Sequence, residues 1–122
     1  MSFTARKGLH FETRARSFLE AQGLTWLESN FRCRLGEIDL IMSEDQCVCF
    51  IEVRYRRSKG YGGAGASITR SKQLKIIRAA QVYLSQHRSL QNRALRFDAL
   101  LFEPDFDGEM TCHWIKNAFY AE

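Results

Sequence analysis

Apolar residues recur along this chain with two different spacings, which predict helices and strands in alternation. Residues 4–22 carry apolar side chains every three or four positions, the period of an amphipathic helix, with Thr4 placed to cap its start and Gly23 to end it. The apolar stripe of this helix consists of Phe11, Ala15, Phe18 and Leu19. Glu12 falls at the border of the stripe, so its carboxylate is expected at the edge of the core.

Three apolar runs follow the first helix and predict three strands. The first covers residues 25–31 and leads into a turn near residues 34–36. The second and third, residues 37–42 and 47–54, flank the polar segment 43–46. Two such runs joined by a short polar segment are typical of a β-hairpin.

The second half of the chain predicts a further helix and two strands. Residues 60–66 are rich in glycine and predict a loop, and helical spacing returns over residues 67–87. The buried face of this helix is expected to contain Leu74, Ile77, Gln81 and Leu84. Strands are expected at residues 95–102 and 110–116. Because a helix joins the third and fourth strands, we expect a crossover connection and a mixed sheet in an α/β fold.

Composition limits the class of protein. The chain has 122 residues, of which 45% are hydrophobic and 26% charged, and this predicts one globular domain spanning residues 1–122. No run approaches the roughly 18 apolar residues of a membrane helix, and the start lacks an apolar signal core, so we expect a cytoplasmic protein without a membrane partner. The cysteines form no CxxC pair, and free thiols are favoured over zinc ligands at Cys33, Cys47, Cys49 and Cys112.

Charge is divided unevenly along the chain. Eleven basic residues and no acidic residue lie between positions 54 and 96, although the net charge is only +4. Such a segment attracts polyanions, and nucleic acid, with DNA as the first candidate, is the leading partner. A solvated helix face next to a basic loop explains the same pattern equally well. The residues expected to contact nucleic acid are Arg56, Arg57, Lys59, Arg70, Lys72, Lys75 and Arg78.

The predicted hairpin gathers acidic side chains on one face. With Glu44 and Asp45 at its tip, Asp39 faces Phe50 across the two strands, and Glu52 is a diagonal neighbour of Asp39. Diagonal residues lie roughly 7–8 Å apart, near enough for two carboxylates to reach one ion. The charged residues on this face are then Glu37, Asp39, Glu52 and Arg54.

Carboxylates crowded among apolar neighbours require a positive partner. Arg54 is one candidate, as an internal salt bridge. A divalent cation, Mg²⁺ or Mn²⁺, is the other, because Mg²⁺ prefers oxygen ligands and needs only one or two protein carboxylates. A metal beside a basic surface would suit phosphodiester hydrolysis.

Four segments carry a family resemblance that extends over nearly the whole chain. They are GEIDLI at residues 36–41, FIEVRYR at 50–56, SKQ at 71–73 and RFD at 96–98. In this order and spacing they resemble the YraN family of small, functionally uncharacterised bacterial proteins. That family resembles in turn the restriction-endonuclease-like superfamily, which includes archaeal Holliday-junction resolvases and has a PD-(D/E)xK pattern.

The resemblance implies a fold and a set of site residues. The fold is a restriction-endonuclease-like α-β-β-β-α-β core with a mixed central sheet flanked by helices. Asp39 matches the acidic residue of the second strand, Glu52 that of the third, and Arg54 stands in the place of the lysine. Glu12 is similar to the first-helix glutamate of the resolvases, and Gln73 matches a polar position near their site. The implied catalytic residues are these five, and the implied metal ligands are Glu12, Asp39 and Glu52.

Arg54 is a departure from the superfamily pattern. Arginine keeps its proton far above neutral pH, so Arg54 would orient a phosphate or stabilise charge rather than act as a base. The leading hypothesis is a Mg²⁺-dependent endonuclease-like protein that acts on DNA, with branched and single-stranded DNA as candidate substrates. A non-catalytic nucleic-acid-binding module and a protein-interaction domain with an acidic partner are the alternatives. The sequence leaves open whether the protein is a monomer or a homodimer.

Overall fold

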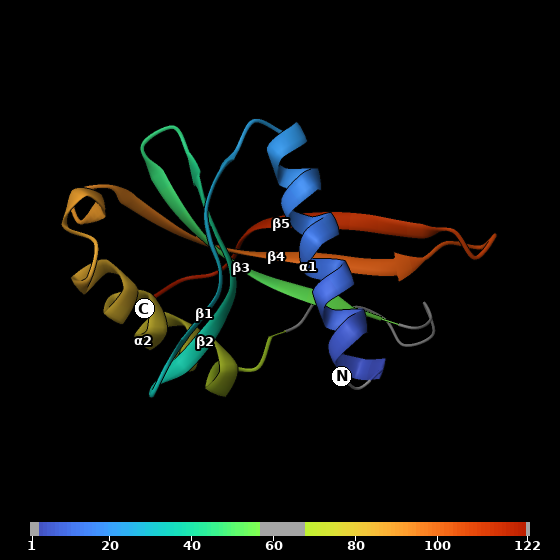
Figure 1. Cartoon of the computed structure of the whole chain (residues 1–122), viewed down its shortest axis with the longest axis horizontal. Helices are drawn as coiled ribbons and strands as arrows, with labels where there is room; N and C mark the ends of the chain where they lie inside the picture. The colour runs from blue at the N-terminus through green and yellow to red at the C-terminus, as the bar shows by residue number, and fades with distance from the viewer. Residues whose placement is uncertain (1–2, 57–67, 122) are drawn as a thin grey trace.

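A five-stranded mixed sheet with a helix packed on each face forms the protein (Figure 1). The computed structural model describes residues 3–56 and 68–121. Its elements are α1 (Phe3–Ala21), β1 (Thr25–Cys33), β2 (Gly36–Glu44), β3 (Cys47–Tyr55), α2 (Arg70–Ser85), the short 3-10 helix η2 (Arg88–Leu90), β4 (Ala94–Pro104) and β5 (Met110–Phe119). The predicted order of helices and strands and the α/β class are therefore confirmed. The predicted loop at residues 60–66, Arg57 and Lys59 lie outside the described residues.

The strands lie in the sheet in the same order as in the chain. Neighbouring strands are antiparallel except β3 and β4, which run parallel from the Cys47–Ala94 pair to the Tyr55–Phe102 pair. Helix α2 makes the crossover between these two strands, as expected. The first turn of α2 therefore follows the carboxyl end of β3, where the predicted acidic residues are found.

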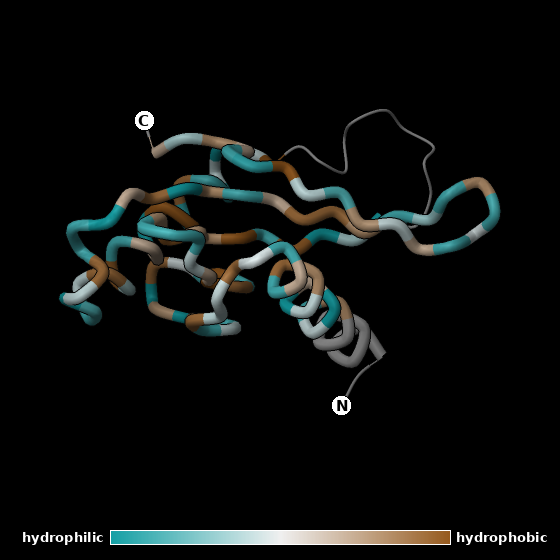
Figure 2. Tube along the Cα trace, turned by 90° about the horizontal axis from the view of Figure 1, so that it is seen from above, coloured by the Kyte–Doolittle hydropathy of each residue, from teal (hydrophilic) through white to brown (hydrophobic). Residues whose placement is uncertain are grey.

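The core has two layers, one on each face of the sheet, and Figure 2 shows apolar residues concentrated along the strands between them. On one face, α1 contributes its predicted stripe of Phe11, Ala15 and Leu19, whereas Phe18 is only partly buried. Cys49 is buried in this layer, and all four cysteines are free. Within the described residues, neither long helix is apolar enough to cross a membrane.

The buried face of α2 differs from the prediction. Gln81 is exposed, and Leu74 and Leu84 are only partly buried. The buried residues of α2 are Ile76, Ile77, Ala79, Ala80 and Tyr83. The helix is turned in this way because small alanines allow close contact with the sheet, while the Tyr83 ring packs edge-on against the rings of Phe31 and Phe50.

The register predicted for the β2–β3 hairpin is wrong. Glu44 pairs with Cys47, and Leu40 pairs with Ile51, two positions further along β3 than expected. The tip is formed by Asp45 and the residue after it, because Asp45 adopts a left-handed φ of 54°, a conformation that aspartate tolerates in a two-residue turn. A shift of two positions keeps every side chain on its face, so the common face predicted for the acidic residues does not depend on the error.

Candidate functional site

Asp39 lies where strands β2 and β3 separate. Regular pairing between them ends at Leu40 and Ile51, so Asp39 and Glu52 are the next residues on the two strands. Instead of a continued ladder, the backbone N–H of Val53 donates to Oδ2 of Asp39 at 2.8 Å. The two carboxylates are therefore brought together at one opening of the sheet, closer in register than the predicted diagonal.

Strand β2 is also rotated about its own axis at Asp39. Ile38 belongs to the core layer that contains α2, whereas Leu40 belongs to the layer that contains α1. Residues two positions apart share a face in a regular strand, so the strand must be rotated between them. This rotation directs the Asp39 side chain toward β3 rather than into either core layer.

A cavity of about 230 Å³ receives the acidic side chains. It is lined by Phe11, Glu12, Glu37, Asp39, Glu52, Val53, Arg54, Tyr55 and Lys72. We call it the carboxylate cavity. The Phe11 ring stacks on Tyr55, with ring centroids 4.6 Å apart, and lies 5.0 Å from Phe102. These contacts fix α1 against the end of β3, and they place half-buried Glu12 on the cavity wall, as its position at the border of the stripe predicted.

The surroundings of Asp39 make its charged form costly. Burial raises the pKa of Asp39 to about 7, and the negative charges of Glu52 and Glu12 act in the same direction. The hydrogen bond from Val53 and the positive charge of Lys72 lower this pKa only in part. An added cation in the cavity would favour the carboxylate form.

Glu52 has a raised pKa for the same main reason, its burial, and Glu37 adds repulsion. Lys72 and Arg54 both lower this pKa, and the Lys72 ammonium lies 4.0 Å from Oε1 of Glu52. The lysine beside the acidic pair thus comes from α2, and the sequence interpretation missed it by assigning Lys72 only to nucleic-acid binding. The crossover topology was the available signal, since it places the start of α2 over the end of β3.

Gln73 does not line the carboxylate cavity. Its side-chain amide donates to the carbonyl of Ile68 at 2.7 Å and accepts from Arg70 Nη1 at 2.9 Å. Gln73 and Lys72 are adjacent on α2, so they project roughly 100° apart and only Lys72 faces the acidic pair. The structure gives Gln73 a place in the hydrogen bonds at the start of α2.

The basic residues predicted to bind nucleic acid occupy different environments. Arg56 forms an ion pair and a hydrogen bond with Glu103, which is almost fully buried. Arg70, Lys75 and Arg78 are exposed on α2. Of the predicted set, the residues on α2 therefore offer the accessible charge among the described residues.

The motif Arg96-Phe97-Asp98 contains a buried ion pair, separate from the carboxylate cavity, that stabilises the fold. Asp98 is fully buried and accepts three hydrogen bonds from Arg96 Nε and Nη2 at 2.9 to 3.1 Å. It also accepts from the Trp114 indole at 3.0 Å and from the backbone N–H of Asn117 at 3.1 Å. Arg96 Nη1 reaches Glu44 at 2.7 Å. Because both oxygens of Asp98 are fully engaged, it has no free ligand atom to offer.

The carboxylates of the cavity fit the expected metal in part. Among the described side chains, those of residues 11–56 and 68–121, no three His, Cys, Asp or Glu side chains converge closely enough to hold one ion together. Asp39 and Glu52 do fit Mg²⁺, because their oxygen atoms share one cavity and Mg²⁺ needs only one or two carboxylates alongside water. A third ligand from Glu12 stays a prediction.

Comparison with known proteins finds the same family in each case. The model of the uncharacterised protein family UPF0102 matches residues 11–102, which include every residue of the carboxylate cavity. The UPF0102 protein NE0719 of Nitrosomonas europaea is 50% identical over 119 residues, covering 98% of each chain. The UPF0102 protein of Alcanivorax borkumensis is 46% identical, covering 94% of this chain and 92% of its own. The UPF0102 protein YraN of Escherichia fergusonii is 45% identical, covering 95% and 86%.

Proposed function

Since the chain belongs to the uncharacterised protein family UPF0102, as its resemblance to YraN predicted, we propose a function from the site itself. The protein is a Mg²⁺-dependent, endonuclease-like enzyme that binds DNA and hydrolyses its phosphodiester bonds. The carboxylate cavity is its active site, and the basic side of α2 belongs to its DNA-binding surface.

One observation carries this proposal: the half-buried carboxylates of Asp39 and Glu52 line one cavity together with Glu12 and Glu37. Both pKa values are raised even though Lys72 and Arg54 stand nearby. In a structural salt bridge the positive partner would outweigh burial and the pKa of the acid would fall. The acidic pair is therefore arranged for a further positive charge.

The acidic residues of the cavity have the role of metal ligands in this proposal. Asp39 and Glu52 would hold the metal, and Glu12 lines the same cavity. Bound there, Mg²⁺ supplies activation of a water molecule and neutralisation of phosphate charge. The Val53 N–H holds one oxygen of Asp39 and so fixes the direction of its carboxylate.

The two basic residues act on the substrate. Lys72 and Arg54 line the same cavity as the acidic pair, so both can contact the phosphate that is to be cleaved. Their positive charges stabilise the negative charge that grows on the phosphate oxygens in the transition state. Arg54 does this without exchanging a proton.

The test is cleavage of labelled duplex, four-way junction and single-stranded DNA during titration with Mg²⁺ or Mn²⁺. The wild type is expected to cut at least one substrate, and Asp39→Asn/Glu52→Gln to cut none. A matched control, Asp107→Asn/Glu109→Gln, removes two exposed acidic charges from the β4–β5 turn and should leave cleavage unchanged. Cleavage by the wild type no greater than that of the Asp39/Glu52 variant overturns the enzymatic proposal. Metal-free binding that persists in that case identifies a non-catalytic nucleic-acid-binding module instead.

A further inference from the structure

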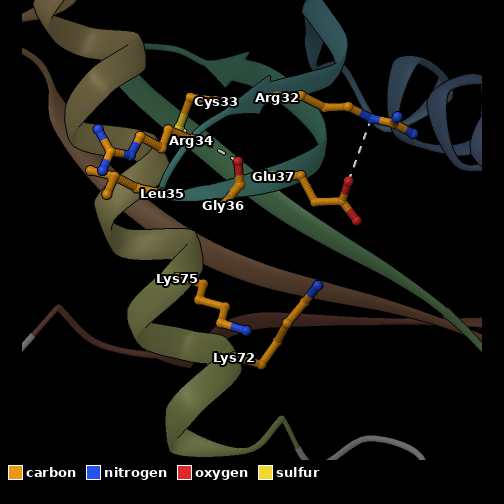
Figure 3. Close-up of a pocket in the computed structure, with 8 residues that line it drawn as sticks. All are labelled: Arg32, Cys33, Arg34, Leu35, Gly36, Glu37, Lys72 and Lys75. Atoms are coloured by element: carbon orange, nitrogen blue, oxygen red, sulfur yellow. Dashed lines mark hydrogen bonds and ion pairs between the residues drawn. The ribbon is translucent and has the colours of Figure 1, made fainter.

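A second cavity, of about 390 Å³, lies beside the carboxylate cavity, between the β1–β2 turn and the start of α2 (Figure 3). It is lined by Arg32, Cys33, Arg34, Leu35, Gly36, Glu37, Lys72 and Lys75. We call it the basic cavity. The side chains of Lys72 and Lys75 extend from α2 into the space below the turn (Figure 3).

Positive charge dominates the basic cavity. Four of its lining residues are basic, and Glu37 is the one acidic residue among them. Glu37 lies 3.4 Å from Arg32, but their side chains are 50% and 76% exposed, and such a pair is weak. Within the described part of the chain, Arg34 and Lys75 form no ion pair, and the nearest acidic partner of Lys72 is Glu52, 4.0 Å away. The cavity therefore suits an anion.

The two walls of the basic cavity are held firmly together. A side-chain carbon at Gly36 would lie 2.6 Å from the backbone oxygen of Lys75, so the turn and α2 touch through their backbones. Only glycine allows this approach. The backbone of the turn is thus held at a fixed distance from the backbone of α2, and the cavity between them does not depend on a loop closing.

The basic cavity and the carboxylate cavity share part of their wall. Lys72 and Glu37 line both. A chain of phosphates that enters the carboxylate cavity would therefore continue directly into the basic one. Mg²⁺ sites in proteins typically combine one or two carboxylates with phosphate oxygens of the substrate, which favours a nucleic-acid strand over an acidic peptide here.

We propose that the basic cavity is a phosphate subsite, which holds the phosphodiester group next to the one in the carboxylate cavity on the same nucleic-acid strand. This inference rests on the function proposed for the carboxylate cavity. What it predicts for the basic cavity is phosphate binding, not catalysis. Lys75 holds the adjacent phosphate, Arg34 adds positive charge from the turn, and Lys72 stands between the two groups. Arginine and lysine supply the charge-assisted hydrogen bonds that phosphate accepts.

Binding without metal tests the subsite separately from catalysis. Fluorescence anisotropy in EDTA measures the affinity of labelled single-stranded and duplex oligonucleotides over a series of salt concentrations. Arg34→Gln/Lys75→Gln is expected to bind about tenfold more weakly, with a salt slope reduced by about 1, because the charges around one phosphate are lost. Arg34→Lys/Lys75→Arg, which keeps both charges, should restore binding to within about threefold.

The matched control is Arg88→Gln/Arg93→Gln, which removes two basic charges beyond the far end of α2. Its affinity should stay within about twofold of the wild type. An equal loss of affinity in both double variants overturns the subsite, since net charge alone would then explain binding. Stronger competition by a polyglutamate peptide than by unlabelled oligonucleotide also overturns it, in favour of an acidic protein partner.

The outcomes separate the two proposals. Normal cleavage by the wild type with unchanged binding by Arg34→Gln/Lys75→Gln removes the subsite and leaves the enzyme. Weakened binding by that variant, together with no cleavage by the wild type, leaves the subsite and removes the enzyme. Failure of the wild type to bind any oligonucleotide at low salt overturns both.

Discussion

The backbone N–H of Val53 donates to the Asp39 carboxylate at 2.8 Å, in the place where the next rung of the β2–β3 ladder would lie. The carboxylate is therefore oriented by the main chain of the neighbouring strand before any ligand is present. A group oriented in this way needs little rearrangement to bind an ion, which is what a metal ligand requires.

Asp39 should make the metal-free protein less stable as the pH rises. Its pKa is raised from 3.8 to about 7 in the folded state, so the folded protein holds a proton that the unfolded chain releases in that window. The free energy of unfolding therefore falls as pH increases from about 4 to about 7 and is level above it. Asp39→Asn has no proton to lose and still offers Val53 an acceptor. In EDTA, the unfolding free energy of the variant relative to that of the wild type should increase by on the order of 2 kcal/mol between about pH 5 and pH 8.

Urea unfolding at the two pH values measures this difference directly. Groups outside the carboxylate cavity titrate alike in both proteins, so the change in the difference between them reports on Asp39 together with its interaction with Glu52. A difference in unfolding free energy that is the same at both pH values would show that Asp39 is not protonated in the folded, metal-free protein.

Glu52→Gln should weaken metal binding without loss of stability. The substitution relieves repulsion from neighbouring acids and removes one negative charge from the site, while the lost contact with Lys72 is long, at 4.0 Å, and contributes little. Calorimetric titration with Mn²⁺ should show at least about tenfold lower affinity. Glu109→Gln, in the exposed β4–β5 turn, serves as the control.

A crystal soaked in Mn²⁺ locates the ion without assuming any activity. An anomalous peak is expected between Asp39 and Glu52. A marked fall in the stability of Glu52→Gln, with no such peak, would instead identify Glu52 as a structural ion-pair residue held by Lys72 and Arg54.

Gly36→Ala should destabilise the protein by about 1–3 kcal/mol, because the added carbon cannot fit beside the Lys75 backbone without moving the turn. It should also weaken metal-free oligonucleotide binding, since the walls of the basic cavity would separate. Leu35→Ala, at the neighbouring exposed position, should change stability by less than about 0.5 kcal/mol. Denaturant midpoints of the two variants check the prediction, and equal midpoints would contradict it.

Asp98→Ala should be far more damaging to the fold than Asp39→Asn. It removes the carboxylate that satisfies Arg96 and the Trp114 indole inside the core, which is expected to cost about 3 kcal/mol or more. Far-ultraviolet circular dichroism during urea unfolding measures this cost. A mild effect, comparable with that of an exposed substitution, would mean that the core can rearrange around Arg96.

Much of the fold and the central pair of the site followed from the sequence. Spacing of apolar residues predicted the order of elements, and the period of two along strands predicted a common face for Asp39 and Glu52. The register was wrong by an even number of residues, which does not change faces, but the two side chains reach one cavity also because β2 is rotated at Asp39, which the alternation did not predict. The family expected from the motifs was confirmed by the family match.

What the sequence did not reveal depends on long-range packing. The register depends on the left-handed conformation of Asp45. The presence of an aspartate in a polar turn does not by itself predict that conformation. The buried partner of Arg56 is Glu103, 47 positions away, and no local pattern connects them. The position of Lys72 depends on how α2 is rotated on the sheet, which its alanines and Tyr83 determine.

The shared position of Lys72 has a thermodynamic consequence. An anion that draws its ammonium toward the β1–β2 turn would leave Glu52 with less neutralising charge, and Glu52 would then attract a cation more strongly. By linkage, a cation at Glu52 must strengthen the anion's binding by the same factor. Phosphate and metal would thus each increase the affinity for the other through a single side chain, with no movement of the backbone.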